Sequence, residues 1–176
     1  PGKELVLAGL PSTPGSSSLS LVNPGSTEAI AHLEVIGAHG TFSPEGLAPV
    51  TVPPGSVVSV PIDDVLDGTP MAVRITSDNP VTGSIRTTKN GDTAYATGVL
   101  LLRDSTSFAL PQGRSRLVLS SLGEAGSVQV FGFDARGHKV LSTTVKVAAE
   151  SSVGVTLDLA IRYVQLIADR PAVVAG

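Results

Sequence analysis

The sequence passes twice through the same order of short apolar runs and turns, and this repeat constrains the fold more than any other feature. Each pass has four blocks, in which a Val/Leu/Ile-rich run meets Gly, Pro, Asn, Asp or Ser. The paired blocks are residues 19–25 with 117–123, 31–40 with 127–137, 50–62 with 145–157, and 71–80 with 163–171. Self-similarity over a long period is typical of a duplicated structural unit.

The two copies differ in their connections. Leu117 lies 98 residues after Leu19, whereas Pro171 lies 91 residues after Pro80. The second copy has therefore lost about seven residues between its blocks, a loss that surface loops tolerate. The Pro-Pro-Gly-Ser turn at residues 53–56 is kept only in the first copy, because residues 148–151 read Ala-Ala-Glu-Ser.

Short alternating runs between turn residues predict an all-β fold. Apolar and polar residues alternate in residues 32–35 and 127–130, as on strands with one wet face. The 19 Gly and 13 Pro supply frequent turns. Each copy carries about seven such runs, so we expect two tandem immunoglobulin-like, Greek-key β-sandwich repeats. The two repeats are either separate or share strands. An up-and-down barrel is the alternative.

The region between the copies predicts a hairpin and sets the domain boundaries. Asn90-Gly91 stands between the apolar runs 81–86 and 94–102, a strong hairpin signal. We place the first repeat at residues 1–105 and the second, shorter repeat at 106–176. The second copy lacks a counterpart of the run 94–102. Either the chain is cut there, or residues 4–7 fold back to complete the second repeat. Residues 62–68 fit one helical turn.

Composition argues against several partners. The net charge of −3, with no run of Lys or Arg, does not favour nucleic acid. Apolar stretches such as residues 98–102 are much shorter than the roughly 20 residues of a membrane-spanning helix. There is no cysteine to form disulfides or bind metals. The chain starts at Pro1 without a leader, so we expect a segment of a larger protein.

The candidate chemical residues have simpler explanations. No Gly-x-Ser-x-Gly is present, and His32, His39 and His138 fall in a strand and in turns. We predict no enzyme, no catalytic residue and no cofactor. A hidden hydrolase would need a Ser or Asp within hydrogen-bond reach of a histidine in a pocket. His39 and His138 occupy matching turns, which fits exposed histidines better than metal ligands.

Acidic and turn residues likewise predict no metal site. Asp63, Asp64 and Asp67 fit the start of a short helix, and Asn90 with Asp92 fits a hairpin turn, although all carry oxygen ligands that suit calcium. We interpret residues 78–80, Asp-Asn-Pro, as a turn.

Arginines and aromatics are the remaining candidates for binding. Arginines are scattered over both copies and fit a solvated sheet face or, alternatively, contact with an anionic wall polymer, among them Arg74, Arg86, Arg103, Arg114, Arg116, Arg136 and Arg162. Carbohydrate sites use exposed aromatic rings, and the chain has Tyr95, Tyr163 and four Phe. Phe131 and Phe133 share one side of their strand, opposite Val128 and Val130. That side must be exposed or covered, by the other repeat or by a partner.

Three motifs carry a family resemblance: the strand and Asn-Pro-Gly turn at residues 21–25, the Val-Pro-Pro-Gly-Ser turn at 52–56, and the strand 73–77 followed by Pro80-Val81. Together they resemble an uncharacterised family of secreted actinobacterial proteins with repeated β modules, a domain of unknown function. Residues 120–123 and 148–150 replace two of these turns in the second copy. The resemblance implies an exported or envelope-associated protein and adds no catalytic residue.

We therefore expect a non-catalytic, extracytoplasmic structural or interaction module of the bacterial cell envelope. A cell-wall polymer or carbohydrate-binding domain is the alternative. The expected partner is an envelope protein or a wall polymer, and the expected location is outside the cytoplasm, in a larger envelope-anchored protein.

Overall fold

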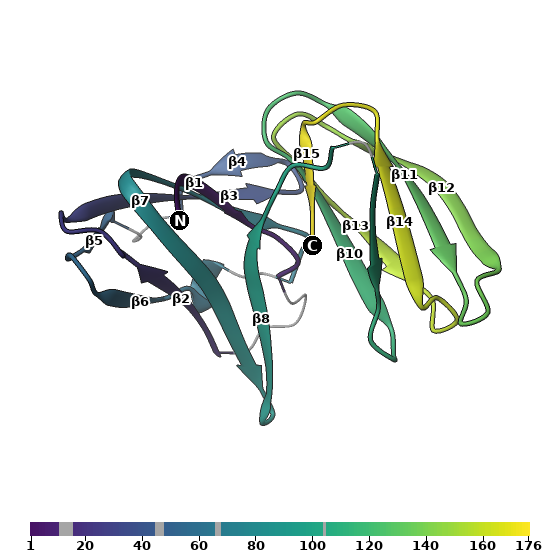
Figure 1. Cartoon of the computed structure of the whole chain (residues 1–176), viewed down its shortest axis with the longest axis horizontal. Coiled ribbons are helices and arrows are strands. Elements are labelled where there is room, and N and C mark those ends of the chain that lie inside the picture. The colour runs from purple at the N-terminus through teal and green to yellow at the C-terminus, as the bar shows by residue number, and fades with distance from the viewer. Residues whose placement is uncertain (11–15, 45–47, 66–67, 104) are drawn as a thin grey trace.

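The structure, a computed structural model, describes residues 1–10, 16–44, 48–65, 68–103 and 105–176. Within them the chain is built of antiparallel strands and a single turn of 3-10 helix, so the all-β prediction is confirmed. The strands divide into two groups that pair only within themselves, which we call the first and second sandwich (Figure 1).

The first sandwich contains eight strands and the 3-10 turn η1 (Asp63–Val65). The strands are β1 (Gly2–Leu7), β2 (Ser16–Val22), β3 (Ala29–Gly37), β4 (Gly40–Phe42), β5 (Val50–Val52), β6 (Val57–Pro61), β7 (Ala72–Lys89) and β8 (Asp92–Val99). The helical turn predicted at residues 62–68 is thus present, although residues 66 and 67 lie outside the described residues.

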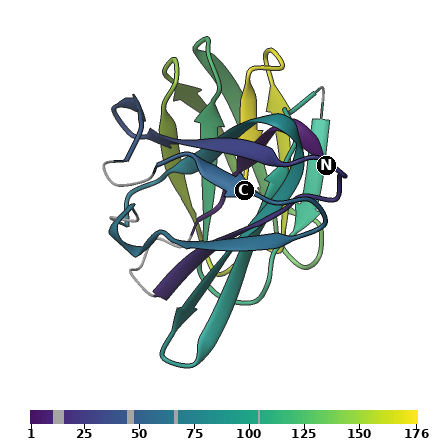
Figure 2. The ribbon, with the colours of Figure 1, turned by 90° about the vertical axis from the view of Figure 1, so that its left-hand side faces the viewer.

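Strand β7 connects the two layers of the first sandwich. Its residues 72–77 pair with β3 and with β1, whereas its residues 82–89 pair with β2 and β8. The apolar sides of both ladders meet in one core that includes Leu21, Val35 and Ile85. The β7–β8 hairpin projects beyond the rest of this sandwich (Figures 1 and 2).

The second sandwich has seven strands in two sheets, in the orders β13-β10-β15 and β12-β11-β14-β9. The strands are β9 (Ser105–Ala109), β10 (Ser115–Ser121), β11 (Gly126–Phe133), β12 (Lys139–Val147), β13 (Ser152–Leu157), β14 (Tyr163–Ala168) and β15 (Val173–Ala175). Leu119 from one sheet and Val130 from the other are fully buried in a common core.

The hairpin prediction is confirmed, and the prediction of a turn at residues 78–80 is wrong. Asn90 and Gly91 have φ values of 51° and 83°, as a two-residue hairpin turn of type I′ requires. Residues 77–80 instead continue β7. There the Asp78 carboxylate accepts the Ile30 N–H at 2.7 Å, and the side chain of Asn79 donates to the Glu28 carbonyl at 2.7 Å, so both side chains hold β7 against the start of β3.

Residues 4–7 do not complete the second sandwich. They pair with β7 from Glu4↔Thr76 to Leu7↔Val73, and Val6 and Leu7 also pair with β8. In the second sandwich β9 takes the corresponding place, since it pairs with β14. Among the described strands of the second sandwich, none corresponds to β8.

Matched hydrogen bonds relate the two sandwiches residue by residue. The N–H of Asn23 donates to the carbonyl of Ser56 at 3.0 Å, and the N–H of Ser121 donates to that of Ser151 at 2.9 Å. Likewise, the Asp169 carboxylate accepts the N–H of Ser127 at 3.0 Å, as Asp78 accepts that of Ile30. These anchors place Asn23 with Ser121, Ser56 with Ser151, Ile30 with Ser127 and Asp78 with Asp169.

Candidate functional site

The two sandwiches meet in a buried apolar junction, which is the most distinctive site of the molecule. Val6, Ala8, Ile36 and Ala72 of the first sandwich cluster with Val174 of the second. Each of them is at most 4% exposed. Ile36 and Ala72 point away from the first core because they alternate with the core residues Val35 and Val73 along β3 and β7.

Buried hydroxyl groups reinforce this junction. The Ser152 hydroxyl donates to the Ile36 carbonyl across the junction at 2.6 Å. The Ser120 and Ser152 hydroxyl oxygens lie 2.7 Å apart, so the Ser120 hydroxyl donates to that of Ser152. Both serines are buried. A buried carbonyl without a hydrogen-bond partner costs about 1–3 kcal/mol. These two linked hydrogen bonds therefore fix the relative position of the sandwiches.

Arg74 is a charged group at the junction. Its Nη2 donates to the carbonyl of Leu122 in the second sandwich at 2.5 Å. Its guanidinium also lies near two carboxylates of the first sandwich, with Nη1 3.5 Å from Glu34 Oε2 and Nε 3.9 Å from Glu4 Oε1. Nε itself is buried without a hydrogen bond. The paired carboxylates offset the cost of placing this cation at a covered edge.

Two glycines allow the backbones to touch. A Cβ on Gly9 would lie 2.6 Å from the carbonyl carbon of Gly176, and a Cβ on Gly176 would lie 2.4 Å from that of Ala8. Gly9 also has a φ of +76°, a backbone conformation that residues with a side chain rarely adopt. Gly176 is held in turn by two backbone hydrogen bonds to Val118 at 2.8 and 3.0 Å. The junction therefore depends on close backbone packing.

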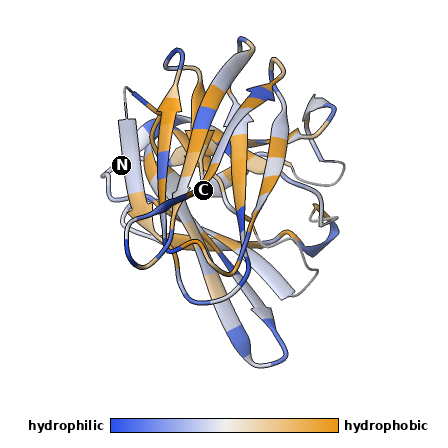
Figure 3. Ribbon diagram, turned by 90° about the vertical axis from the view of Figure 1, so that its right-hand side faces the viewer, coloured by the Kyte–Doolittle hydropathy of each residue, from blue (hydrophilic) through white to orange (hydrophobic). Residues whose placement is uncertain are grey.

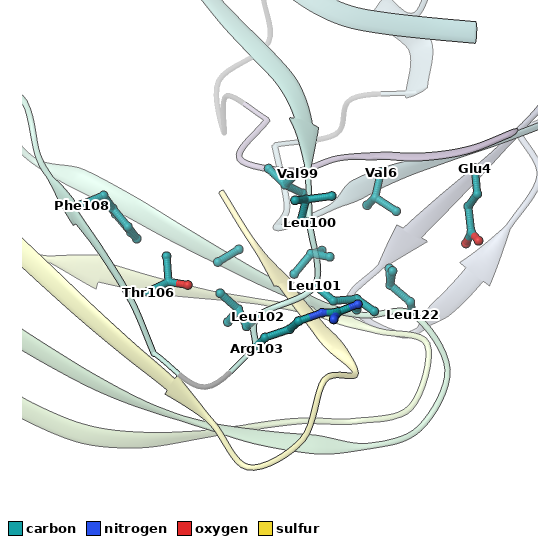
Figure 4. A pocket seen from close by; sticks show the side chains of 12 residues that line it. Glu4, Val6, Val99, Leu100, Leu101, Leu102, Arg103, Thr106, Phe108 and Leu122 are labelled. Carbon is teal, nitrogen blue, oxygen red and sulfur yellow. The ribbon is translucent and has the colours of Figure 1, made fainter. Parts of the chain in front are cut away.

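An open hollow of about 870 Å³ lies beside the junction (Figure 4). The segment between β8 and β9 forms one side through Leu100, Leu101 and Leu102, and β9 adds Phe108. Leu100 is 89% exposed. The polar groups on the wall are Glu4, Arg103 and Thr106. This wall is mostly apolar, and its described residues include no histidine and no pair of acidic side chains suited to acid–base catalysis.

The predicted histidine candidates lie elsewhere. His32 is exposed on β3, and His39 and His138 occupy the corresponding hairpins that follow β3 and β11. His39 lines a hollow of about 270 Å³ with Thr41, Phe42 and Met71. His138 Nδ1 lies 3.3 Å from Asp134 Oδ2 in an exposed hairpin turn. The backbone N–H of His138, at 2.9 Å, is the largest cause that lowers the pKa of Asp134.

The acidic candidates act as local anchors. Asp63 begins η1, and its carboxylate accepts the N–H of Ser17. Asp67 lies outside the described residues. Asp92 accepts the N–H of Thr93 at 2.9 Å in the β7–β8 hairpin. Across the described ranges, no three His, Asp or Glu side chains come together as metal ligands would.

The arginines do not gather on one face. Arg74 and Arg116 belong to the junction, where Arg116 Nη1 donates to the Gly68 carbonyl at 3.2 Å. Arg103 lines the hollow, and Arg86 is exposed on β7. Arg162 donates to the Leu159 carbonyl at 2.6 Å, and Arg136 lies in the hairpin after β11. Arg114 is exposed just before β10.

The face that carries Phe131 and Phe133 is not the contact between the sandwiches. Val128 and Val130 are fully buried, whereas both phenylalanines are partly exposed. The Lys139 ammonium lies 5.4 Å from the centroid of the Phe131 ring. Figure 3 views the molecule from this side and shows hydrophobic bands along the strands.

Sequence reasoning missed the junction residues. Ser120, Ser152 and Gly176 are ordinary strand and turn residues in sequence, and Arg74 is one of eight scattered arginines. One signal was available: the run Leu117-Val118-Leu119 has apolar residues on both sides of its strand, as expected for a strand covered on both faces.

In the described part of the chain, no helix is long and apolar enough to cross a membrane.

Comparison with known proteins identifies a family and no activity. The chain is similar to part of a solved β-glucuronidase from glycoside hydrolase family 2, with 9% identity and a TM-score of 0.29 over 95% of this chain and 20% of that chain. It thus spans about a fifth of that protein. It is also similar to the stem and receptor binding domain of the spike protein P1 from bacteriophage PM2, with 7% identity and a TM-score of 0.22 over 96% of this chain and 75% of that one.

No curated protein matches the sequence. A family match covers residues 1–158, which include the first sandwich, the junction segment and most of the second sandwich. The match agrees with the resemblance to a domain of unknown function read from the turn motifs. The chain belongs to the family described as "Family of unknown function (DUF5719)".

Proposed function

We propose that this chain is a non-catalytic structural and interaction module that works outside the cytoplasm, in the bacterial cell envelope, as part of a larger envelope-anchored protein. Its mechanism is surface complementarity. The two sandwiches act as one rigid body that holds its exposed faces at fixed positions and so serves as a spacer and a docking surface.

The buried junction is the observation that carries this proposal. Domains joined only by a linker move relative to one another. Here Ile36 and Ala72 are fully covered, and the Ser152 hydroxyl bonds to the Ile36 carbonyl inside the contact. A rigid arrangement of this kind is useful to a spacer, whereas the described residues that line the hollow beside it include one carboxylate, Glu4, and no histidine.

The rigidity is tested with two glycine variants. Gly9→Ala places a Cβ against Gly176 at the junction, whereas Gly137→Ala has a similar φ of +82° and no neighbour within 4 Å. Both variants introduce the same backbone strain, so any difference between their unfolding transitions comes from the steric clash at the junction. We expect one calorimetric unfolding transition for the wild type and for Gly137→Ala, and two for Gly9→Ala. Two transitions in the wild type would contradict a rigid body.

The envelope role is tested by retention on envelope fractions. The purified chain is immobilised and exposed to membrane proteins, peptidoglycan, anionic polymers and a cytoplasmic extract at low and moderate salt. Specific retention of one envelope protein supports a docking module. Retention of cytoplasmic proteins alone would contradict the proposed location.

A wall-polymer or carbohydrate-binding role is the second candidate, favoured by the outer face of β6, β2, β7 and β8. Paired residues there form rows of hydroxyl groups, such as Ser59, Ser20, Ser84 and Thr97. The next row holds Arg86 beside Tyr95, which is 67% exposed. The rows of hydroxyl groups can form hydrogen bonds with sugars, the Tyr95 ring can stack on a sugar ring, and Arg86 attracts anionic groups.

Polymer binding is measured by co-sedimentation with insoluble wall polymers. Tyr95→Ala is expected to reduce binding at least fivefold by removing the exposed ring, and Leu159→Ala, an exposed residue of the second sandwich, to leave it unchanged. Equal binding by both variants would exclude this face as a polymer site.

A further inference from the structure

The junction joins two sheet faces of different kinds. The first sandwich contributes the β3/β7 face, defined by Ile36 and its cross-strand partner Ala72. The second sandwich contributes the β10/β13 face, defined by Ser120, Ser152 and Val174, where Ser120 pairs with both others. Because the sandwiches are related copies, each face has a counterpart on the other sandwich.

The counterpart of the β3/β7 face lies on β11 and β14. The Asp78–Ile30 and Asp169–Ser127 hydrogen bonds fix the correspondence. Ile36 lies six residues after Ile30, and Phe133 lies six residues after Ser127, so Ile36 corresponds to Phe133. Ala72 lies six residues before Asp78, and Tyr163 lies six residues before Asp169, so Ala72 corresponds to Tyr163. Phe133 and Tyr163 are direct cross-strand partners, as Ile36 and Ala72 are. We call this pair, with Phe131, the β11/β14 face.

The counterpart of the β10/β13 face lies on β2 and β6. The Asn23–Ser56 and Ser121–Ser151 hydrogen bonds fix this correspondence. The adjacent residues are Val22 and Val57 in the first sandwich and Ser120 and Ser152 in the second. Val22 pairs with Val57 and with Thr82, as Ser120 pairs with Ser152 and Val174. We call these three residues the β2/β6 face.

Both counterpart faces present apolar side chains to solvent. Tyr163 is 50% exposed and Val57 is 62% exposed, whereas Ile36 and Ala72 at the junction are 0% exposed. Phe131, Phe133 and Val22 are partly exposed. The chain thus carries, at two separate places, the two halves of a contact that it already makes internally. Uncovered apolar sheet faces are typical of docking sites.

We propose that the β11/β14 face of one copy binds the β2/β6 face of a second copy, with the two faces opposed as their counterparts are within the chain. Phe133 and Tyr163 then cover Val22 and Val57. Gln165 stands where Arg74 stands at the junction, so its side-chain amide can donate to the Pro24 carbonyl, the counterpart of the Leu122 carbonyl. The inference rests on the proposed docking role and names a partner for it.

The contact between copies is weaker than the internal one for three reasons. Val57 has no hydroxyl where Ser152 donates to Ile36. Ser84 carries a Cβ where Gly176 has none, and a Cβ on Gly176 would lie 2.4 Å from the carbonyl carbon of Ala8, so the sheets of two copies stay farther apart than those at the junction. No chain segment links the second copy, so association also costs translational and rotational freedom. Self-association therefore requires high protein concentration.

The geometry is head-to-tail, because the two faces differ. A pair of chains still has one free face of each kind, so association continues into longer chains rather than stopping at a dimer. A two-fold dimer would instead bury the same face of both copies.

The experiment is sedimentation velocity of the full chain over a wide concentration range. The wild-type sedimentation coefficient is expected to rise with concentration. Val57→Arg and Tyr163→Arg each remove one face and are expected to stay monomeric, whereas Ile30→Arg, on β3 outside both faces, is expected to associate like the wild type. Circular dichroism confirms that each variant is folded.

A mixture of Val57→Arg and Tyr163→Arg is the decisive sample. Each variant retains the face that the other lacks, so the mixture is expected to form dimers and nothing longer. A wild type that stays monomeric, or a mixture that stays monomeric, overturns the inference. The single calorimetric transition expected for the rigid module does not depend on association. If the chain does not self-associate, the proposed rigid module is therefore still tested by calorimetry.

Discussion

The two sandwiches hold the same chain reversal with different side chains. In the first, Asn23 is fully buried, and its side chain donates to the carbonyls of Thr27 at 2.7 Å and Val52 at 2.9 Å and accepts the Gly25 N–H at 2.9 Å. In the second, Ser121 is equally buried but donates only to the Glu124 carbonyl at 2.5 Å and accepts the Gly123 N–H at 3.4 Å. The position requires a polar anchor, and the first sandwich relies on it more.

A second matched turn shows the same division. The Ser56 hydroxyl donates to the Pro53 carbonyl at 2.7 Å, and the Ser151 hydroxyl donates to the Ala148 carbonyl at 3.0 Å. The preceding residues are Gly55, with a φ of 63°, and Glu150, with a φ of 48°. The turn is therefore kept in both copies although its proline is not. The serine and the left-handed backbone define it.

Replacing the buried anchors gives the largest expected effect. Asn23→Ala leaves the Val52 and Thr27 carbonyls and the Gly25 N–H without their partner, and we expect a loss of about 3 kcal/mol in the free energy of unfolding, at about 1–3 kcal/mol for each buried polar group. Ser121→Ala is expected to cost about 1 kcal/mol. Urea denaturation measures both. A larger loss in Ser121→Ala would reverse the comparison.

Exchanging the left-handed residues gives a smaller effect. Glu150→Gly relieves a side chain in a left-handed conformation but increases the entropy of the unfolded chain, so we expect a gain of roughly 0.5 kcal/mol. Gly55→Ala introduces the corresponding strain in the first sandwich and is expected to cost about 1 kcal/mol. The same urea experiment applies. If Glu150→Gly destabilised the chain, the Glu150 side chain would have to make a stabilising contact.

The smallest expected effect is a dependence on pH in the second sandwich. The N–H of Ser127, its hydroxyl and the nearby Arg170 lower the pKa of Asp169 in the folded state. Its ionised form is therefore preferred by the fold, so its stabilising contribution is present above the ordinary aspartate pKa of about 4 and is lost as the pH falls through the lower, folded value.

This pH effect is measured by thermal unfolding of the wild type and of Asp169→Asn between neutral and acidic pH. The two melting temperatures are expected to converge as the pH falls below about 4. A difference that does not change with pH would show that the carboxylate charge contributes nothing, and Asp169 would then act only through its shape.

Local sequence signals predicted the strands and the hairpin well. Asn90-Gly91 gave the correct turn because only residues that tolerate a positive φ fit both of its positions. Residues 77–80 misled the same reasoning. Asp, Asn and Pro favour turns, but the side chains of Asp78 and Asn79 bond to the start of β3, and β7 continues through them. At the matching place in the second sandwich, residues 169–172 separate β14 from β15. Whether such a segment continues a strand or forms a turn depends on contacts with residues that are distant in sequence.

The candidate site was hardly predictable from sequence. The histidine candidates lie on an exposed strand position and in exposed turns, and the acidic candidates act as local anchors, whereas the junction is made by residues such as Ile36, Ala72 and Ser152. Their side chains are ordinary for strands. Sequence patterns report which side of a strand is apolar, and they do not report which other sheet covers it.

The sequence by itself determined the β-rich fold, the duplication and the positions of most turns, because alternation and turn propensity act over a few residues. Tertiary structure decided that β7 spans two ladders, that residues 4–7 pair with the first sandwich, and that the β10/β13 face is covered while the β2/β6 face is open. These features depend on close approach between segments far apart in sequence. A glycine, a serine hydroxyl or an arginine at the point of contact then decides which faces can meet.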